Sequence, residues 1–197
     1  MLTGIAIGPT RSQPSTAPFR APHRQEVTLN FAFEPSRNPV PANERAARRV
    51  DPVFGRGHTD LMTILPWSQD KGWHDAKVTS RAALTVDPAT AVLHYAQEIF
   101  EGLKAYRMED GSAALFRPDA NARRFRDSAR RMAMPELPDD LFLASVEALV
   151  RADREWIPTS EGGSLYLRPF MIASEAFLGV KPSSEYLYIV LASSVGS

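Results

Sequence analysis

Two helical segments follow one another in the middle of this chain, and β-type runs lie on both sides of them. The first segment, RPDANARRFRDSARRMAM, begins at Pro118 and has apolar residues at three- and four-residue steps, at Ala122, Phe125, Ala129 and Met132. The second, DDLFLASVEALVRADREW, ends before Pro158. Each segment therefore has one apolar face that must pack on something else.

The runs around these helices are β-type. They are LMTILPW, SRAALTVDPAT (a strand ending in a turn at Asp87-Pro88), two short runs flanking Asp110-Gly111, and, after the helices, SLYLRPFMIA and EYLYIVLAS. AVLHYAQEIFEGL fits a helix and a strand equally well. The order of strands, two helices and strands predicts an α+β domain over residues 59–197, with the helices on one face of a sheet.

Residues 1–58 differ from the rest, because half of the sixteen prolines lie there. This composition predicts a Pro-rich, partly irregular arm, with VTLNFAF at 27–33 as an isolated strand. The first 25 residues contain arginines and no acid, as transit peptides do, but four prolines break the helix that such a peptide needs. We expect a cytoplasmic protein.

Composition excludes several classes of function. Basic and acidic residues balance at 23 each, so no net charge attracts nucleic acid or a membrane surface, and no apolar run is long enough to span one. The chain has no cysteine, its four histidines lack metal-ligand spacing, and no glycine-rich phosphate loop occurs. We expect no metal site, no nucleic-acid partner and no membrane partner.

Two patterns indicate anion binding. In SLYLRP the alternation of a strand places Tyr166 and Arg168 on one face and Leu165 and Leu167 on the other, and the planar fork of an arginine suits a carboxylate. The arginines of NARRF lie near a helix start, where an anion is favoured. From the residues alone, solvent-facing or ion-paired arginines are the better explanation of both patterns, and Tyr95 and Phe100 are better explained as core residues.

The long motifs resemble one family. HYAQEIFEGLKAYR, LFRPDANARRF and SLYLRPFMIASEAFLGV, in this order, resemble the branched-chain amino acid aminotransferases, which are pyridoxal 5′-phosphate enzymes of fold type IV. The resemblance runs from about residue 60 to 195. It implies the N-terminal small domain of such an enzyme, with a mixed or antiparallel sheet and two helices on one face, and transfer of an amino group from Leu, Ile or Val to 2-oxoglutarate.

The resemblance also implies roles for individual residues. Arg124 of the N-x-x-R motif would anchor the cofactor phosphate. The residues that would bind substrate are Tyr95, Phe100, Tyr166, Arg168 and Val180. Tyr95 and the loop from Leu178 to Val180 would reach the partner subunit of a homodimer.

The chain departs from the family in one respect. The Schiff-base lysine belongs to a C-terminal cofactor domain, and none of the four lysines, Lys71, Lys77, Lys104 and Lys181, matches its motif. Because transamination needs that amine, we expect no catalytic residue here, incomplete cofactor binding and no activity of this chain alone. Two alternatives remain: a naturally short, non-enzymatic partner of a longer subunit, and another fold type IV enzyme such as a D-amino-acid aminotransferase or an aminodeoxychorismate lyase.

Overall fold

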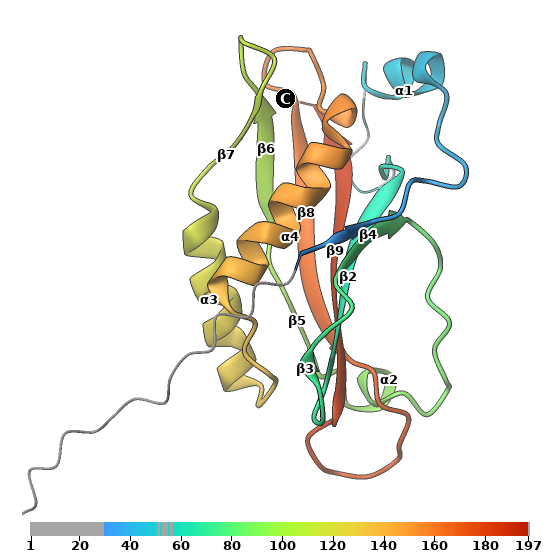
Figure 1. The fold of residues 1–197 in the computed structure, drawn as a ribbon, viewed down its shortest axis with the longest axis vertical. Helices are drawn as coiled ribbons and strands as arrows, with labels where there is room; N and C mark the ends of the chain where they lie inside the picture. Colours follow the sequence, from blue (N-terminus) through green and yellow to red (C-terminus); the bar gives the residue numbers. More distant parts are fainter. Residues whose placement is uncertain (1–29, 51, 53–54, 56, 197) are drawn as a thin grey trace, which may run out of the picture.

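The computed structural model describes residues 30–50, 52, 55 and 57–196 of the 197-residue chain. In this part of the chain one sheet has the strand order β1-β4-β2-β9-β8-β6-β7, with β3 beside β2 and β5 beside β8 (Figure 1). The strands are β1 (Ala32–Phe33), β2 (Leu61–Ser68), β3 (Gly72–Trp73), β4 (Lys77–Ser80), β5 (Glu98–Phe100), β6 (Leu103–Arg107), β7 (Ala113–Leu115), β8 (Ser164–Ala173) and β9 (Glu185–Val195). The helices are α1 (Ala42–Arg48), α2 (Ala91–Tyr95), α3 (Pro118–Arg131) and α4 (Asp139–Ala152), followed by a 3₁₀ turn at Arg154–Trp156.

The β8–β9 hairpin forms the centre of the sheet. Its register runs from Ser164 opposite Val195 to Ala173 opposite Tyr186, and every described strand pair except one is antiparallel. The exception is β1, which lies parallel to β4. The sheet is therefore mixed, which is one of the two arrangements expected.

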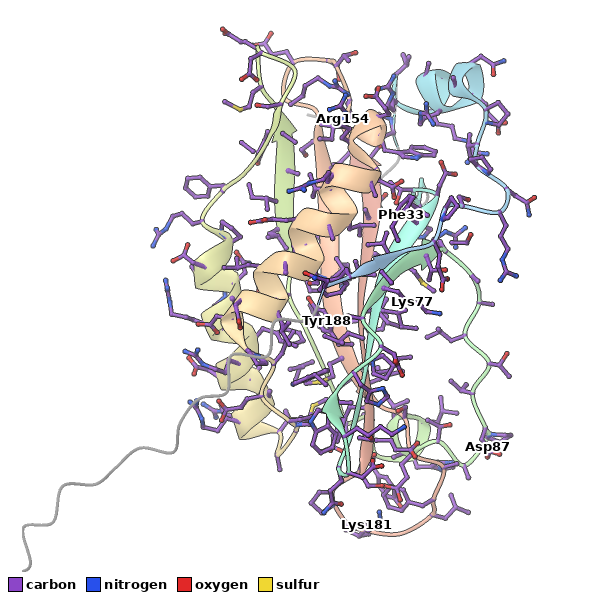
Figure 2. The ribbon with its side chains drawn as sticks, viewed as in Figure 1. Phe33, Lys77, Asp87, Arg154, Lys181 and Tyr188 are labelled. Carbon is purple, nitrogen blue, oxygen red and sulfur yellow. The ribbon has the colours of Figure 1, made fainter. Side chains whose placement is uncertain are left out.

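Helices α3 and α4 pack on the same face of this sheet, as Figure 1 shows. The layer between them and the strands is aromatic, because Phe125 of α3 and Phe142 of α4 both lie within 6.3 Å, ring centroid to centroid, of Tyr188 on β9. Tyr188 is fully buried there, beneath α4 in Figure 2. The α+β class with two helices on one face is confirmed.

Several predicted elements appear close to their predicted bounds. Pro118 occupies the first turn of α3, and β8 spans the whole of SLYLRPFMIA. The predicted hairpin forms between β6 and β7, where Gly111 adopts a positive φ of 79°. The ambiguous segment 91–103 contains both candidates, since α2 ends at Tyr95, Ala96 after it adopts a left-handed conformation, and β5 follows.

The strand predicted within residues 80–90 is wrong. Only Ser80 belongs to a strand, as the last residue of β4, Thr90 forms an isolated bridge with Ala176, and residues 81–87 form an exposed segment outside any strand. Ser80 pairs with Leu61, the first residue of β2, and one more backbone hydrogen bond, from Arg81 to Asp60 at 2.9 Å, follows before the two segments separate. The predicted turn is present, because the amide of Thr90 donates a hydrogen bond to the carbonyl oxygen of Asp87 at 2.9 Å.

The arm predicted over residues 1–58 contains regular structure in its described part. Helix α1 lies within it, and of the strand predicted at 27–33 only Ala32–Phe33 is a strand, since Asn30 and Phe31 are not and residues 27–29 lie outside the described part. Val40 of the arm donates its amide hydrogen to Asp60 Oδ1 at 2.9 Å. The described part of the arm is therefore attached to the sheet, while the division at residue 58 remains a prediction.

Candidate ligand-binding site

The two faces of β8 differ as the alternation predicts. Leu165 and Leu167 are fully buried under the helices, whereas Tyr166 and Arg168 are partly exposed on the opposite side. We call the sheet surface that carries Tyr166 and Arg168, opposite α3 and α4, the open face. The neighbouring strands contribute Lys104 and Phe100 to this surface, opposite Tyr166 and Phe170 respectively.

Arg168 is held by two aromatic residues. Its Nε and Nη2 atoms donate hydrogen bonds to the hydroxyl oxygen of Tyr166, at 3.1 and 2.8 Å. The Cζ atom of its guanidinium group lies 4.5 Å from the ring centroid of Phe100, within cation–π range. No carboxylate in the described part of the chain pairs with Arg168. The remaining N–H groups of this oriented guanidinium can therefore receive a carboxylate ligand.

Gly102 makes this arrangement possible. A Cβ atom on Gly102 would lie 2.5 Å from the hydroxyl oxygen of Tyr166, which is closer than real Cβ contacts. Only glycine therefore lets the phenol occupy this place and hold Arg168. The sequence analysis did not identify Gly102, although its position directly after Phe-Glu at the end of a strand is a signal for close approach.

Arg124 belongs to a second cluster, on the other side of the short segment Glu101–Gly102 that joins β5 to β6. Glu101 accepts hydrogen bonds from Arg124 Nε at Oε1 (2.8 Å) and from Arg124 Nη2 at Oε2 (2.7 Å). Asn121 Nδ2 donates to the same Oε2 at 2.8 Å and to the carbonyl oxygen of Gly102 at 3.1 Å. The sequence analysis missed Glu101 and Asn121, although the N-x-x-R spacing places Asn121 and Arg124 on one side of a helix.

The charges in this second cluster are mutually stabilised. Burial raises the pKa of Glu101, but the hydrogen bonds from Arg124 and Asn121 outweigh it, so that the pKa lies below its ordinary value. The hydrogen bonds to Glu101 and its negative charge raise the pKa of Arg124. Both groups are therefore charged at neutral pH.

Tyr95 and Val180 lie elsewhere. Tyr95, at the end of α2, contacts Phe177 with ring centroids 6.2 Å apart, and the Lys181 amine lies 3.9 Å from the centroid of the Phe177 ring. Val180, in the β8–β9 loop, is 97% exposed. The loop and α2 lie at the same end of the sheet in Figure 1, and Figure 2 shows Lys181 there. No contact among the described residues joins Tyr95 or Val180 to Arg124 or Arg168.

The four lysines lie at separate places. Lys77 and Lys181 form ion pairs with Glu34 and Glu175, Lys71 lies in the exposed β2–β3 turn, and Lys104 is exposed on the open face. Among the described residues no group of histidines and carboxylates could hold a metal ion. None of the helices in that part of the chain has the length and apolar character that crossing a membrane requires.

Arg124 is a suitable partner for the phosphate group of a cofactor. Glu101 engages only Nε and Nη2 of Arg124, and Nη1 makes no hydrogen bond within the described chain. The Arg124 side chain is 61% exposed, so this edge is accessible to an anion. The cluster therefore fits a phosphate group.

Known proteins resemble this chain, although no family model matches it. It is 54% identical over 172 residues to a probable branched-chain-amino-acid aminotransferase of Streptomyces coelicolor, covering 87% of this chain and 48% of the relative. It is 48% identical over 170 residues to a branched-chain-amino-acid aminotransferase of Mycolicibacterium smegmatis, covering 86% of this chain and 46% of the relative.

A solved branched-chain amino acid aminotransferase from Escherichia coli aligns with a TM-score of 0.49 and 21% identity, over 68% of this chain and 41% of that one. The assignment rests on the curated relatives alone, and the chain spans about half of their length. Over the residues that it covers, this chain therefore belongs to the branched-chain-amino-acid aminotransferase family, and its partial coverage fits an N-terminal portion of such a protein.

Proposed function

We propose that this chain supplies one part of the binding site of an aminotransferase that moves an amino group from leucine, isoleucine or valine to 2-oxoglutarate. One observation carries the proposal. In a chain 54% identical to a probable branched-chain-amino-acid aminotransferase, one arginine contacts Phe100 and another contacts the adjacent Glu101, and the first has no carboxylate partner among the described residues.

Arg168 is proposed to bind the carboxylate of the substrate. Amino acids and 2-oxo acids both carry this group, and a guanidinium already oriented by Tyr166 can form paired hydrogen bonds with it. Phe100 is 62% exposed beside Arg168 and offers an apolar wall for a branched side chain. These residues bind and orient the substrate but transfer no proton.

Arg124 is proposed to bind the phosphate of pyridoxal 5′-phosphate, which the family uses. When bound, this cofactor supplies the carbonyl group that accepts the amino group and the ring that stabilises the resulting carbanion. Arg124 contributes electrostatic binding and fixes the position of the phosphate. The four lysines of the chain do not match the family's Schiff-base lysine, so the complementary half must supply it.

Tyr95 and Val180 are proposed to serve a partner subunit. Tyr95, at the end of α2, and Val180, in the β8–β9 loop, are both exposed, and α2 and that loop lie at the same end of the sheet (Figure 1). Exposed apolar side chains of this kind are suited to an interface in a homodimer. The cytoplasmic location remains a prediction.

The experiment joins residues 1–197 to the remaining half of the Streptomyces coelicolor relative. We expect the joined protein to transfer the amino group of leucine to 2-oxoglutarate, and residues 1–197 alone to show no turnover. Replacing Arg124 by alanine should lower kcat/KM about 100-fold, since a charge-assisted contact to the phosphate is lost.

Arg123→Ala is the matched control for this variant. Arg123 is the next residue on α3 and pairs with Asp119 at 2.8 Å, with a similarly exposed side chain. Its replacement should leave kcat/KM within about twofold. A folded joined protein that is active on D-alanine but not on leucine, isoleucine or valine would contradict the substrate class. Turnover by residues 1–197 alone would contradict the conclusion that these residues lack the lysine needed for transamination.

A further inference from the structure

Arg124 is much more exposed than the group that holds it. The Glu101 side chain is 11% exposed and that of Arg124 61%. The backbone amide of Glu101 donates to the carbonyl oxygen of Pro169 on β8 at 2.8 Å, so the acidic residue is fixed to the sheet. A fixed, shielded carboxylate thus faces a long side chain that would otherwise sample many rotamers.

Asn121 fixes the carboxylate from the other side. This residue is 7% exposed on α3, and its amide group bridges Glu101 Oε2 and the carbonyl oxygen of Gly102. Helix α3 and strand β8 therefore hold Glu101 together. Its two oxygens have fixed directions before Arg124 binds them.

The pairing defines which edge of the guanidinium faces outward. Glu101 engages the edge formed by Nε and Nη2, which leaves Nη1 without a hydrogen bond in the described chain. Because the fork is planar, fixing one edge fixes the direction of the other. We propose that Glu101, held by Asn121, is the positioning residue that orients Arg124 for a phosphate group. This inference rests on the proposed role of Arg124.

Glu101 also carries a charge that repels phosphate, so positioning and charge act in opposite directions. At high ionic strength the Debye length falls to a few ångströms and the repulsion is screened. Binding measured in 0.5 M NaCl therefore reduces the long-range part of this repulsion. If the repulsion from Glu101 outweighed its orienting effect, removing the charge of Glu101 would tighten phosphate binding instead.

The first arm of the test observes Arg124 in residues 1–197 without ligand. We expect its Nε–H proton to give a sharp, slowly exchanging NMR signal that is lost in Glu101→Gln and weakened in Asn121→Ala. The exposed turn residue Glu109 is the matched control, and Glu109→Gln should leave the signal unchanged. An Arg124 signal in the wild type that exchanges as fast as that of Arg123 would overturn the inference. Asn121→Ala decides this arm if Glu101→Gln does not fold.

The second arm titrates the same variants with pyridoxamine 5′-phosphate in 0.5 M NaCl and follows the Arg124 signal. We expect the dissociation constant to rise about five- to tenfold in Glu101→Gln, because an unoriented side chain must be ordered on binding. An unchanged or lower dissociation constant would overturn the positioning role. If the wild-type Arg124 signal does not respond to the phosphate, the proposed function fails, whereas the first arm still decides whether Glu101 orients Arg124.

Discussion

The face of the sheet covered by α3 and α4, here called the covered face, and the open face each contain a hydrogen-bonded tyrosine. The two tyrosines have different roles. Tyr188, under α4, is fully buried and its hydroxyl lies 2.8 Å from Ser145 Oγ. Tyr166, on the open face, accepts two hydrogen bonds from Arg168. The first arrangement satisfies a polar group inside the core, whereas the second orients a charged group toward solvent. Changes on the covered face should therefore affect stability, and changes on the open face should affect ligand binding.

The largest expected effect is on the covered face. Phe125→Ala should lower the free energy of unfolding by about 3–5 kcal/mol, because Phe125 is buried and packs against Phe142 and Tyr188. Phe100→Ala is the control on the open face and should lower it by less than about 1 kcal/mol, since Phe100 is 62% exposed. Urea unfolding of both variants measures the difference, and equal losses would remove the distinction between the faces.

The second prediction concerns Asp153, a buried carboxyl just after α4. Burial raises the pKa of Asp153 to about 6, and the negative charge of Asp60 adds to this rise. Hydrogen bonds from Thr59 and from the amide of Leu61 lower the pKa but do not outweigh burial. The Asp153 carboxyl therefore stays protonated up to a higher pH in the folded state than in the unfolded chain, where its pKa is near 3.8. The contribution of Asp153 to stability is present below pH 4 and is lost as the pH rises through 6.

Asp153→Asn removes the titrating carboxyl, so the variant should not lose stability as the pH rises through 6. The free energy of unfolding of the variant minus that of the wild type should grow by about 2–3 kcal/mol between pH 4 and pH 7. Denaturant unfolding at several pH values measures it. A difference that does not change with pH would show that Asp153 titrates normally.

A smaller effect separates the two tyrosines directly. Ser145 Oγ donates to the carbonyl oxygen of Phe142 at 2.7 Å, so the hydroxyl of Tyr188 donates to Ser145. Tyr188→Phe should lower the free energy of unfolding by about 1–2 kcal/mol, because a buried acceptor loses its donor. Tyr166→Phe should change it by less than about 0.5 kcal/mol. The same loss in both variants would contradict the contrast.

The smallest effect is expected at Gly102. A methyl group there would displace the Tyr166 hydroxyl and release Arg168. Gly102→Ala should weaken binding of 4-methylvalerate, a leucine-like carboxylate, about fivefold. Gly111→Ala, in the hairpin turn, is a control that should affect stability but not this affinity, because Gly111 has a positive φ and open space around it. NMR titration measures both affinities.

Features that depend on residues adjacent in sequence were mostly predicted correctly, whereas features that depend on contacts between distant segments mostly were not. Local signals located α3, through Pro118, and the two faces of β8, through its alternation. They did not identify α1, and they extended a strand past Ser80, because the end of β4 depends on where β2 begins. Turn chemistry was read correctly at Asp110-Gly111, where all the determinants are adjacent.

The candidate site shows the same limit. Single arginines were identified from their motifs, but the bidentate contact of Arg124 with Glu101 joins residues 23 positions apart. The contact of Gly102 with Tyr166 joins two strands. Periodicity contains no information on such pairs, which form only when the sheet brings the strands together.

The most direct test of this account maps ligand binding onto the two faces. Residues 1–197 would be titrated with pyridoxamine 5′-phosphate and 4-methylvalerate while amide chemical shifts are recorded. We predict shifts at Phe100, Gly102, Arg124 and Arg168, and none at Phe142, which α4 buries against the covered face. Shifts confined instead to the groove of about 620 Å³ between β1 and α4, which is lined by Phe31, Phe33, Ala148 and Arg151 among others, would contradict the assignment of Arg124 and Arg168 as the ligand-binding residues.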